Sequence, residues 1–121
     1  MSSTLLWSNS DITVNFATQT VTLSQSMTNF DYIKIRYCQS KTATSNAVSI
    51  FISVNEFKTF CLDGYPHVKV GLLSQPNQNG YSRTVSYISD TQIKISEGYN
   101  AGSGTSSNNA AAIPIAIYGM K

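Results

Sequence analysis

Residues that could do chemistry are few and widely spaced in this sequence. A nucleophilic triad needs a base, and the one histidine, His67, lies between Pro66 and Val68 in a segment typical of a strand. No serine stands in the Gly-X-Ser-X-Gly turn of the hydrolases. Zinc would have to use His67 with Cys38 and Cys61, which form no Cys-X-X-Cys pair. The sequence therefore predicts neither a hydrolase of this kind nor a zinc site.

The acidic residues do not suggest a reaction either. Six of them are isolated along the chain, namely Asp11, Asp31, Glu56, Asp63, Asp90 and Glu97. A glycosidase needs two carboxylates about 5 to 10 Å apart in a cleft, and a calcium loop needs Asp at alternate positions. The stretch Gly102-Ser103-Gly104 lacks the Gly-Lys-Ser/Thr ending of a phosphate-binding loop. We expect a protein that is not an enzyme and that holds no metal and no cofactor.

Tyrosines and amide side chains near predicted turns are the best candidates for a binding role. A tyrosine ring can stack on a sugar, and Asn side chains can both donate to and accept from hydroxyl groups. Tyrosine is also common at strand ends in proteins that bind nothing there, so a structural role stays open. The candidate ligand-binding residues are Tyr65, Asn77, Asn79, Tyr81 and Tyr99.

The other aromatic residues are expected in the core, because they stand in apolar or strand-like contexts. They are Trp7, Phe16, Phe30, Phe51 and Phe57. Cys38 and Cys61 are too few for a disulfide framework in a chain of 121 residues, which can bury a core without one. We expect both thiols to be reduced and buried.

Charge is sparse, at 12% of residues, which is about half the usual share for a soluble protein. The net charge is +2, and the basic residues are scattered rather than clustered, so nucleic acid is not an expected partner. No stretch reaches the roughly 18 to 20 apolar residues of a membrane helix. The start, Met1-Ser2-Ser3-Thr4, lacks the features of a signal peptide. We expect a soluble chain that is not exported by the usual route and does not insert into membranes.

Alternation of apolar and polar residues dominates the pattern. Ile33, Ile35 and Tyr37 should face one way, while Lys34 and Arg36 face the other. Further strands are expected at 19–23, 47–54, 57–62, 67–72, 81–87, 92–96 and within the closing run 113–121. No segment shows a sustained helical period. The sequence predicts an all-β fold, a single antiparallel β-sandwich domain over residues 1–121 with a jelly-roll-like arrangement.

Four finer expectations concern the arrangement of these strands. The apolar run 47–54 favours a central strand, and Asn79-Gly80 is a dipeptide typical of a turn. Residues 98–112 are expected to be one long irregular loop. Pro114 lacks a backbone donor, which places the last strand at a sheet edge or Pro114 among its first residues.

Four segments near the two ends of the chain carry a further pattern. They are Leu6-Trp7-Ser8-Asn9, Phe16 to Leu23, Phe30 to Ile35 and Ile113 to Lys121. These segments resemble a C-terminal domain of phage and prophage fibre proteins. That family's pattern is Leu-Trp-X-Asn, Phe-Ala-X-Gln-Thr-Val-X-Leu, an aromatic-Asp-X-Ile-X-Ile strand, and a closing Ile-Pro-X-X-Ile-Tyr-Gly-X-Lys. Residues 39–73 carry no matching motif.

The resemblance implies a homotrimeric β-sandwich at the tip of a head or tail fibre, made in the bacterial cytoplasm and located in the virion. Its implied partners are a bacterial surface glycan or another envelope receptor, together with other virion proteins. It supplies no catalytic residues. Two alternatives stay open, a capsid decoration or assembly module with only virion partners, and a free-standing carbohydrate-binding module.

Overall fold

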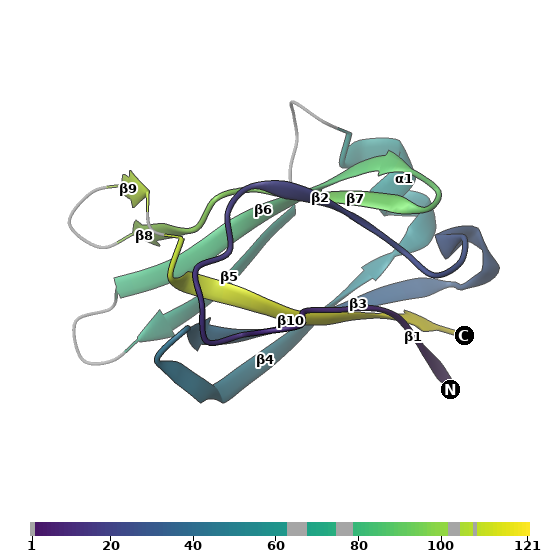
Figure 1. Ribbon diagram of the computed structural model, residues 1–121. Helices are drawn as coiled ribbons and strands as arrows, with labels where there is room; N and C mark the ends of the chain where they lie inside the picture. The colour runs from purple at the N-terminus through teal and green to yellow at the C-terminus, as the bar shows by residue number, and fades with distance from the viewer. Residues whose placement is uncertain (1, 63–67, 75–78, 102–104, 108) are drawn as a thin grey trace.

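A computed structural model describes residues 2–62, 68–74, 79–101, 105–107 and 109–121. Side chains are not described at residue 46 or in the strand segments 68–74, 79–82, 99–101 and 105–107. The described residues form ten strands, one α-helix and one 3-10 turn (Figure 1).

Two antiparallel sheets pack face to face, so the predicted all-β sandwich is confirmed. Sheet A has the order β1-β10-β3-β4, with bounds β1 Ser3–Ser8, β10 Ala111–Met120, β3 Tyr32–Ser40 and β4 Ala43–Ser53. Sheet B has the order β2-β7-β6-β8-β9, with β5 also paired to β6. Its bounds are β2 Gln19–Thr22, β7 Gln92–Ile95, β6 Asn79–Ser89, β8 Tyr99–Ala101, β9 Thr105–Ser107 and β5 Val68–Ser74.

Alternation within the strands builds one main core between the sheets. Each strand directs every second side chain inward, which is why the β-branched residues can meet there. Sheet A contributes Ile33, Ile35 and Ile117, and sheet B contributes Val85, Ile93 and Ile95, all at most 1% exposed.

Strand β10 is central, so the expectation that Pro114 marks an edge strand is wrong. It pairs with β1 on one side and β3 on the other. Proline is tolerated because the pairing with β3 is irregular between Pro114 and Ala116, and because β1 ends at Ser8 opposite Ala116. Beyond that point the Asn9 side-chain amide donates to the Pro114 carbonyl at 2.9 Å.

The expected strand at 57–62 is largely a helix, α1, which spans Val54–Phe60. Val54 and Phe57 lie three residues apart and are both buried, which fixes the helix against the core. Cys61 ends it by donating its backbone N–H to the Phe57 carbonyl at 3.1 Å. A helix of 7 residues is too short to produce a sustained helical period.

Three segments differ from the arrangement that the sequence predicts. Strand β4 lies at the edge of sheet A rather than in its centre, which leaves Phe51 58% exposed instead of in the core. Asn79 and Gly80 pair with Ser74 and Leu73 as strand residues rather than forming the turn. The expected irregular segment 98–112 contains β8 and β9, which pair with each other.

The two ends of the sandwich differ in what they carry. Ser2 and Lys121 exchange two backbone hydrogen bonds, so the chain ends run side by side. They lie toward the same end of the molecule as α1, at the right of Figure 1. The β8–β9 hairpin lies at the opposite end, at the left. The 3-10 turn η1, Met27–Asn29, precedes β3 at the α1 end.

Candidate functional site

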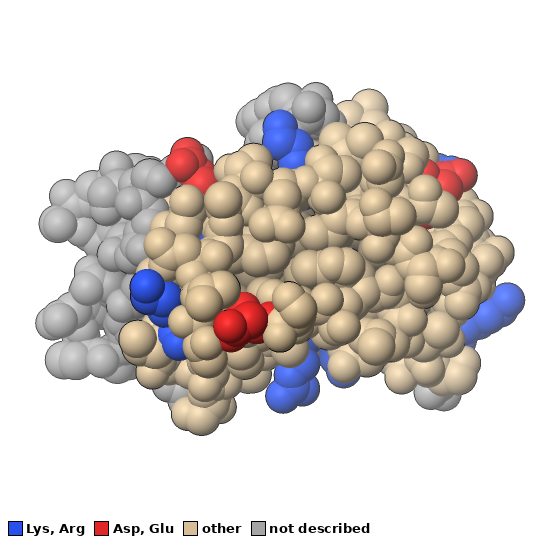
Figure 2. Space-filling view, viewed as in Figure 1, with Lys and Arg blue, Asp and Glu red and all other residues tan. Residues whose placement is uncertain are grey.

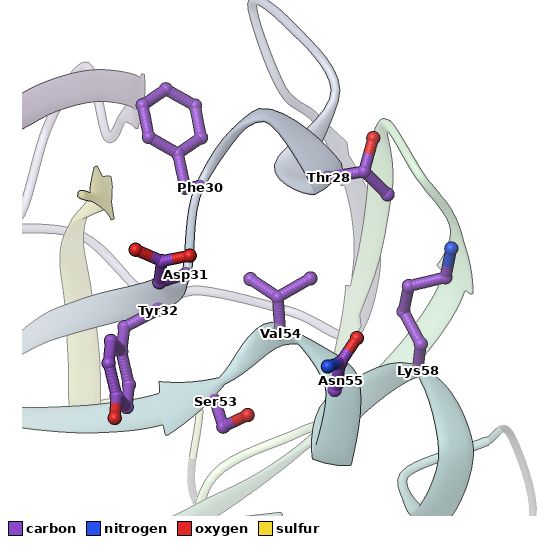
Figure 3. A pocket seen from close by; sticks show the side chains of 8 residues that line it. All are labelled: Thr28, Phe30, Asp31, Tyr32, Ser53, Val54, Asn55 and Lys58. Atoms are coloured by element: carbon purple, nitrogen blue, oxygen red, sulfur yellow. The ribbon is translucent and has the colours of Figure 1, made fainter.

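A pocket with a volume of about 560 Å³ opens at the α1 end of the sandwich (Figure 3). We call it the α1 pocket. Its lining comes from η1, the segment entering β3, the end of β4 and α1. The lining residues are Thr28, Phe30, Asp31, Tyr32, Ser53, Val54, Asn55 and Lys58.

Strand pairing brings these distant segments together. Tyr32 and Ser53 are partners in the β3–β4 register. Just beyond that pair, the Asp31 carbonyl accepts from the Val54 N–H at 2.9 Å, and the Asp31 N–H donates to the Met120 carbonyl at 3.0 Å. The backbone at Asp31 is therefore tied to both α1 and β10, so the fold fixes where this residue stands at the pocket.

Phe30 anchors the same wall from the other side. A Cβ added at Gly119 would lie 2.4 Å from the Phe30 ring, so the ring packs directly on the backbone of β10. Only glycine at this position permits such an approach. The segment that enters β3 is thereby fixed at both Phe30 and Asp31.

Some polar side chains of this pocket have no partner among the described residues, whereas the Thr28 hydroxyl forms a hydrogen bond with that of Ser26 at 2.6 Å. Within the described part of the chain, the Asp31 carboxylate, the Ser53 hydroxyl and the Asn55 amide form no hydrogen bond, and Ser53 does not cap α1 with its side chain. Figure 3 shows Val54 and Asn55 projecting from the start of α1 toward the space between Asp31 and Thr28. These groups are open to water or to a ligand.

Lys58 on the far wall is already neutralised. Its Nζ lies 2.9 Å from Oδ1 of Asp90, and the Tyr87 hydroxyl donates to the same oxygen at 2.7 Å. The bond from Tyr87 and then the contact with Lys58 hold the pKa of Asp90 below its ordinary value, while the pKa of Tyr87 is raised. The uncompensated charge of the pocket is therefore the carboxylate of Asp31.

A carboxylate, an amide and a hydroxyl beside a partly exposed aromatic ring suit a ligand rich in hydroxyl groups. The carboxylate accepts hydrogen bonds, the amide donates and accepts, and Tyr32, 42% exposed, offers a ring for stacking. The arrangement provides no nucleophile paired with a base among these lining residues.

Arg83 is the most buried charged residue described, although the sequence alone marks it only as one of the scattered basic residues. It is 0% exposed, and burial lowers its pKa to about 10, so it stays charged at neutral pH. The guanidinium donates five hydrogen bonds of 2.7–3.0 Å, all to main-chain carbonyls. The acceptors are Ala111 and Ala112 for Nε, Phe16 and Ser96 for Nη1, and Asn109 for Nη2.

These bonds make Arg83 a structural crosslink. The Phe16 ring also lies 5.2 Å from the guanidinium carbon, in cation–π range. Ala112, one of the acceptors, has a φ of 48°, an unusual conformation for a residue with a side chain. The sequence did hold a signal, since Arg83 shares the alternation of the inward-facing Val85.

Three of the five ligand-binding residues expected from sequence lie in described strands of sheet B. Tyr65 and Asn77 fall outside the described residues. Asn79 and Tyr81 lie in β6 and Tyr99 in β8, where Tyr81 pairs with Asn100 and Ser82 with Tyr99. The backbone thus brings Tyr81 and Tyr99 onto neighbouring strands, and their role in binding stays a prediction.

Expectations for the core were largely met. Phe16 and Phe57 are buried, and Trp7 and Phe30 pack against the core while partly exposed. Cys38 and Cys61 are free and buried, as predicted, and burial raises the pKa of both thiols.

The described residues include neither a cluster of metal-ligating side chains nor a membrane-spanning helix. No group of three or more His, Cys, Asp or Glu side chains is placed to hold a metal ion among them. None of the helices described is long and apolar enough to cross a membrane.

Comparison with known proteins does not assign the chain to a family. No protein-family model matches the sequence, and no curated protein matches it.

Proposed function

We propose that this chain is a non-enzymatic domain of a phage head or tail fibre that adheres to a bacterial surface glycan or another envelope component. The observation that carries the adhesive role is the α1 pocket, where Asp31, Ser53 and Asn55 stand without internal partners beside the Tyr32 ring. Asp31 and Asn55 are also exposed, so a ligand can reach both groups.

A glycan fits this pocket better than a charged metabolite does. Neighbouring sugar hydroxyls can donate to the Asp31 carboxylate and bond to the Asn55 amide, while the apolar face of a sugar ring packs on Tyr32. Lys58 is committed to Asp90, so the pocket has no free cation in its described lining to attract an anion.

The fibre context rests on the resemblance of the chain ends, and the packing of those segments is consistent with it. Three of the four resembling segments adjoin each other, because β1 and β3 flank β10. Asn9 bonds to Pro114, and Phe30 packs on Gly119. The residues of the pattern therefore hold one sheet together.

The homotrimer is part of the same proposal. Near the end of α1 and in β6, Phe60, Leu62 and Ile88 are 60%, 47% and 39% exposed. Burial of such apolar surface would favour association. Light scattering should give three times the chain mass, and a monomer at micromolar concentration would contradict this part.

Adhesion is tested by measuring the binding of labelled protein to a panel of bacterial cells. Wild type should bind at least one strain, and free sugars from that strain's surface should compete. Asp31→Asn should reduce binding about tenfold, the loss of a charge-assisted hydrogen bond. Glu56→Gln is the matched control, because it removes the same charge from α1 outside the pocket lining.

Two outcomes would count against the proposal. Equal binding by wild type and Asp31→Asn would show that the α1 pocket does not carry the adhesion. If no strain bound, while the protein bound other virion proteins, the role would be assembly instead.

A further inference from the structure

The outward face of sheet A carries a row of large side chains that crosses all four strands. Leu5 of β1 pairs with Tyr118 of β10, Tyr118 pairs with Lys34 of β3, and Lys34 pairs with Phe51 of β4. Leu5 is 50% exposed and Phe51 58% exposed. We call the outward residues Leu5, Tyr32, Lys34, Arg36, Phe51 and Tyr118 the sheet A face.

Lys34 is held at the middle of this row by two aromatic rings. Its Nζ lies 5.3 Å from the centre of the Tyr118 ring and 5.9 Å from that of Phe51. Cation–π attraction at these distances restrains the ammonium group above the sheet. The site is thus a fixed positive charge between two aromatic surfaces.

The charge of the face is of one sign. Arg36 follows Lys34 on the same side of β3 and is exposed. The four strands of sheet A contain no Asp or Glu, and neither Lys34 nor Arg36 forms an ion pair with a described residue. Figure 2 shows Lys and Arg atoms projecting from the lower side of the molecule, where sheet A lies in Figure 1.

We propose that the sheet A face binds an acidic glycan, a sugar polymer that carries carboxylate or phosphodiester groups. The unpaired charges of Lys34 and Arg36 complement the anionic groups, and the exposed ring of Phe51 stacks on a sugar. A second copy of the chain is disfavoured as the occupant, because a face with only positive charges repels its own copy.

The face is continuous with the α1 pocket. Tyr32 lies two residues before Lys34 on the same side of β3, and it also lines the pocket. One polymer can therefore place a neutral sugar in the pocket and its anionic groups over Lys34 and Arg36. The inference rests on the proposed adhesive function and adds the chemical class of the glycan.

Binding of defined polymers to the purified protein tests this. The probes are polygalacturonate for carboxylates, poly(glucosyl phosphate) for phosphodiesters, dextran as a neutral polymer and inorganic polyphosphate as an anion without sugar. Wild type should bind at least one of the first two, more weakly as salt rises, and should prefer it to dextran. Which of the two binds more tightly identifies the source of the charge.

Substitutions distinguish binding at the sheet A face from attraction by the overall positive charge of the chain. Lys34→Gln with Arg36→Gln should weaken binding of the preferred polymer about tenfold. Lys41→Gln with Lys121→Gln removes the same two charges outside the face and should leave binding unchanged. Phe51→Ala should weaken binding of the glycan several-fold while leaving polyphosphate binding unaltered.

Four results would overturn the inference. They are absence of binding to both acidic polymers, equal binding of dextran, equal effects of the two double variants, and dissociation of an oligomer by the face variant, which would make the face an interface between copies. Failure of the adhesive function would be read separately, in the cell-binding assay with Asp31→Asn. That variant should leave the salt dependence of polymer binding unchanged.

Discussion

The two ends of β10 each meet a charged residue, and the surroundings of those residues are opposite. At Ala111 the buried Arg83 donates five hydrogen bonds to main-chain carbonyls. At Met120 the strand fixes the backbone of Asp31, whose carboxylate has no partner in the described chain. The charge of Arg83 is bound by carbonyls of the fold, whereas the charge of Asp31 is free to bind a ligand. Hydrogen-bond satisfaction thus separates a structural polar group from a candidate binding group.

The largest expected effect follows from removing the satisfied charge. Arg83→Met should lower the free energy of unfolding by about 4 kcal/mol or more, because several buried carbonyls lose their donors together. Urea unfolding measures the change. Arg36→Met, the same substitution at an exposed site, should change stability by less than about 0.5 kcal/mol. Similar losses of unfolding free energy in the two variants would contradict the structural role of Arg83.

A smaller effect is expected where β10 supports the pocket. Gly119→Ala should cost about 1 to 3 kcal/mol, because the new methyl group would overlap the Phe30 ring. In a Phe30→Leu background the same change should cost less, since the ring is gone. Urea unfolding of the four proteins of this cycle gives the coupling. Additive costs would show that the ring does not restrict position 119.

The unsatisfied groups should contribute little to stability. Asp31→Asn, Ser53→Ala and Asn55→Ala should each change the free energy of unfolding by less than about 0.5 kcal/mol, because none breaks a described hydrogen bond. The same urea experiment measures this. A loss of 2 kcal/mol or more, of the order of a buried polar group left unsatisfied, at any of the three would assign it to the fold instead.

The smallest effect concerns the pH dependence of the stability that Asp90, the ion-pair partner of Lys58, contributes. The pKa of Asp90 is lower when folded than its ordinary 3.8, so its stabilising contribution is complete above pH 3.8 and is lost as pH falls through the folded value. Carbon NMR of the Asp90 carboxyl group should show the depressed pKa. Tyr87→Phe should move it upward, since the bond from Tyr87 is the main cause. An unchanged pKa in Tyr87→Phe would contradict that cause.

Local patterns in the sequence predicted the strands well, but pairing across the chain did not follow from them. The alternation of Ile33, Ile35 and Tyr37 is local, and all three are buried as predicted. The central position of β10 depends on β1, over a hundred residues away in sequence, and on a bulge that accommodates Pro114. Such non-local pairing leaves no short-range signal.

The α1 pocket was missed for the same reason. Asp31 and Asn55 lie in different elements, and only the pairing of Tyr32 with Ser53 brings them together. The sequence pattern predicts strands at 47–54 and 57–62 and no helix, so it gives no sign that Asn55 stands in the first turn of α1. Arg83 was visible in the alternation of β6, but its charge suggested the surface.

The most direct test of the account is an amide NMR titration of the protein with glucose, galactose and N-acetylglucosamine in turn. The account predicts that at least one sugar shifts the signals of Asp31, Tyr32, Ser53 and Asn55, and that the Arg83 side-chain signals stay in place. Shifts confined to other regions, or none at the pocket with any of the three sugars, would contradict the claim that unsatisfied polar groups mark the binding site.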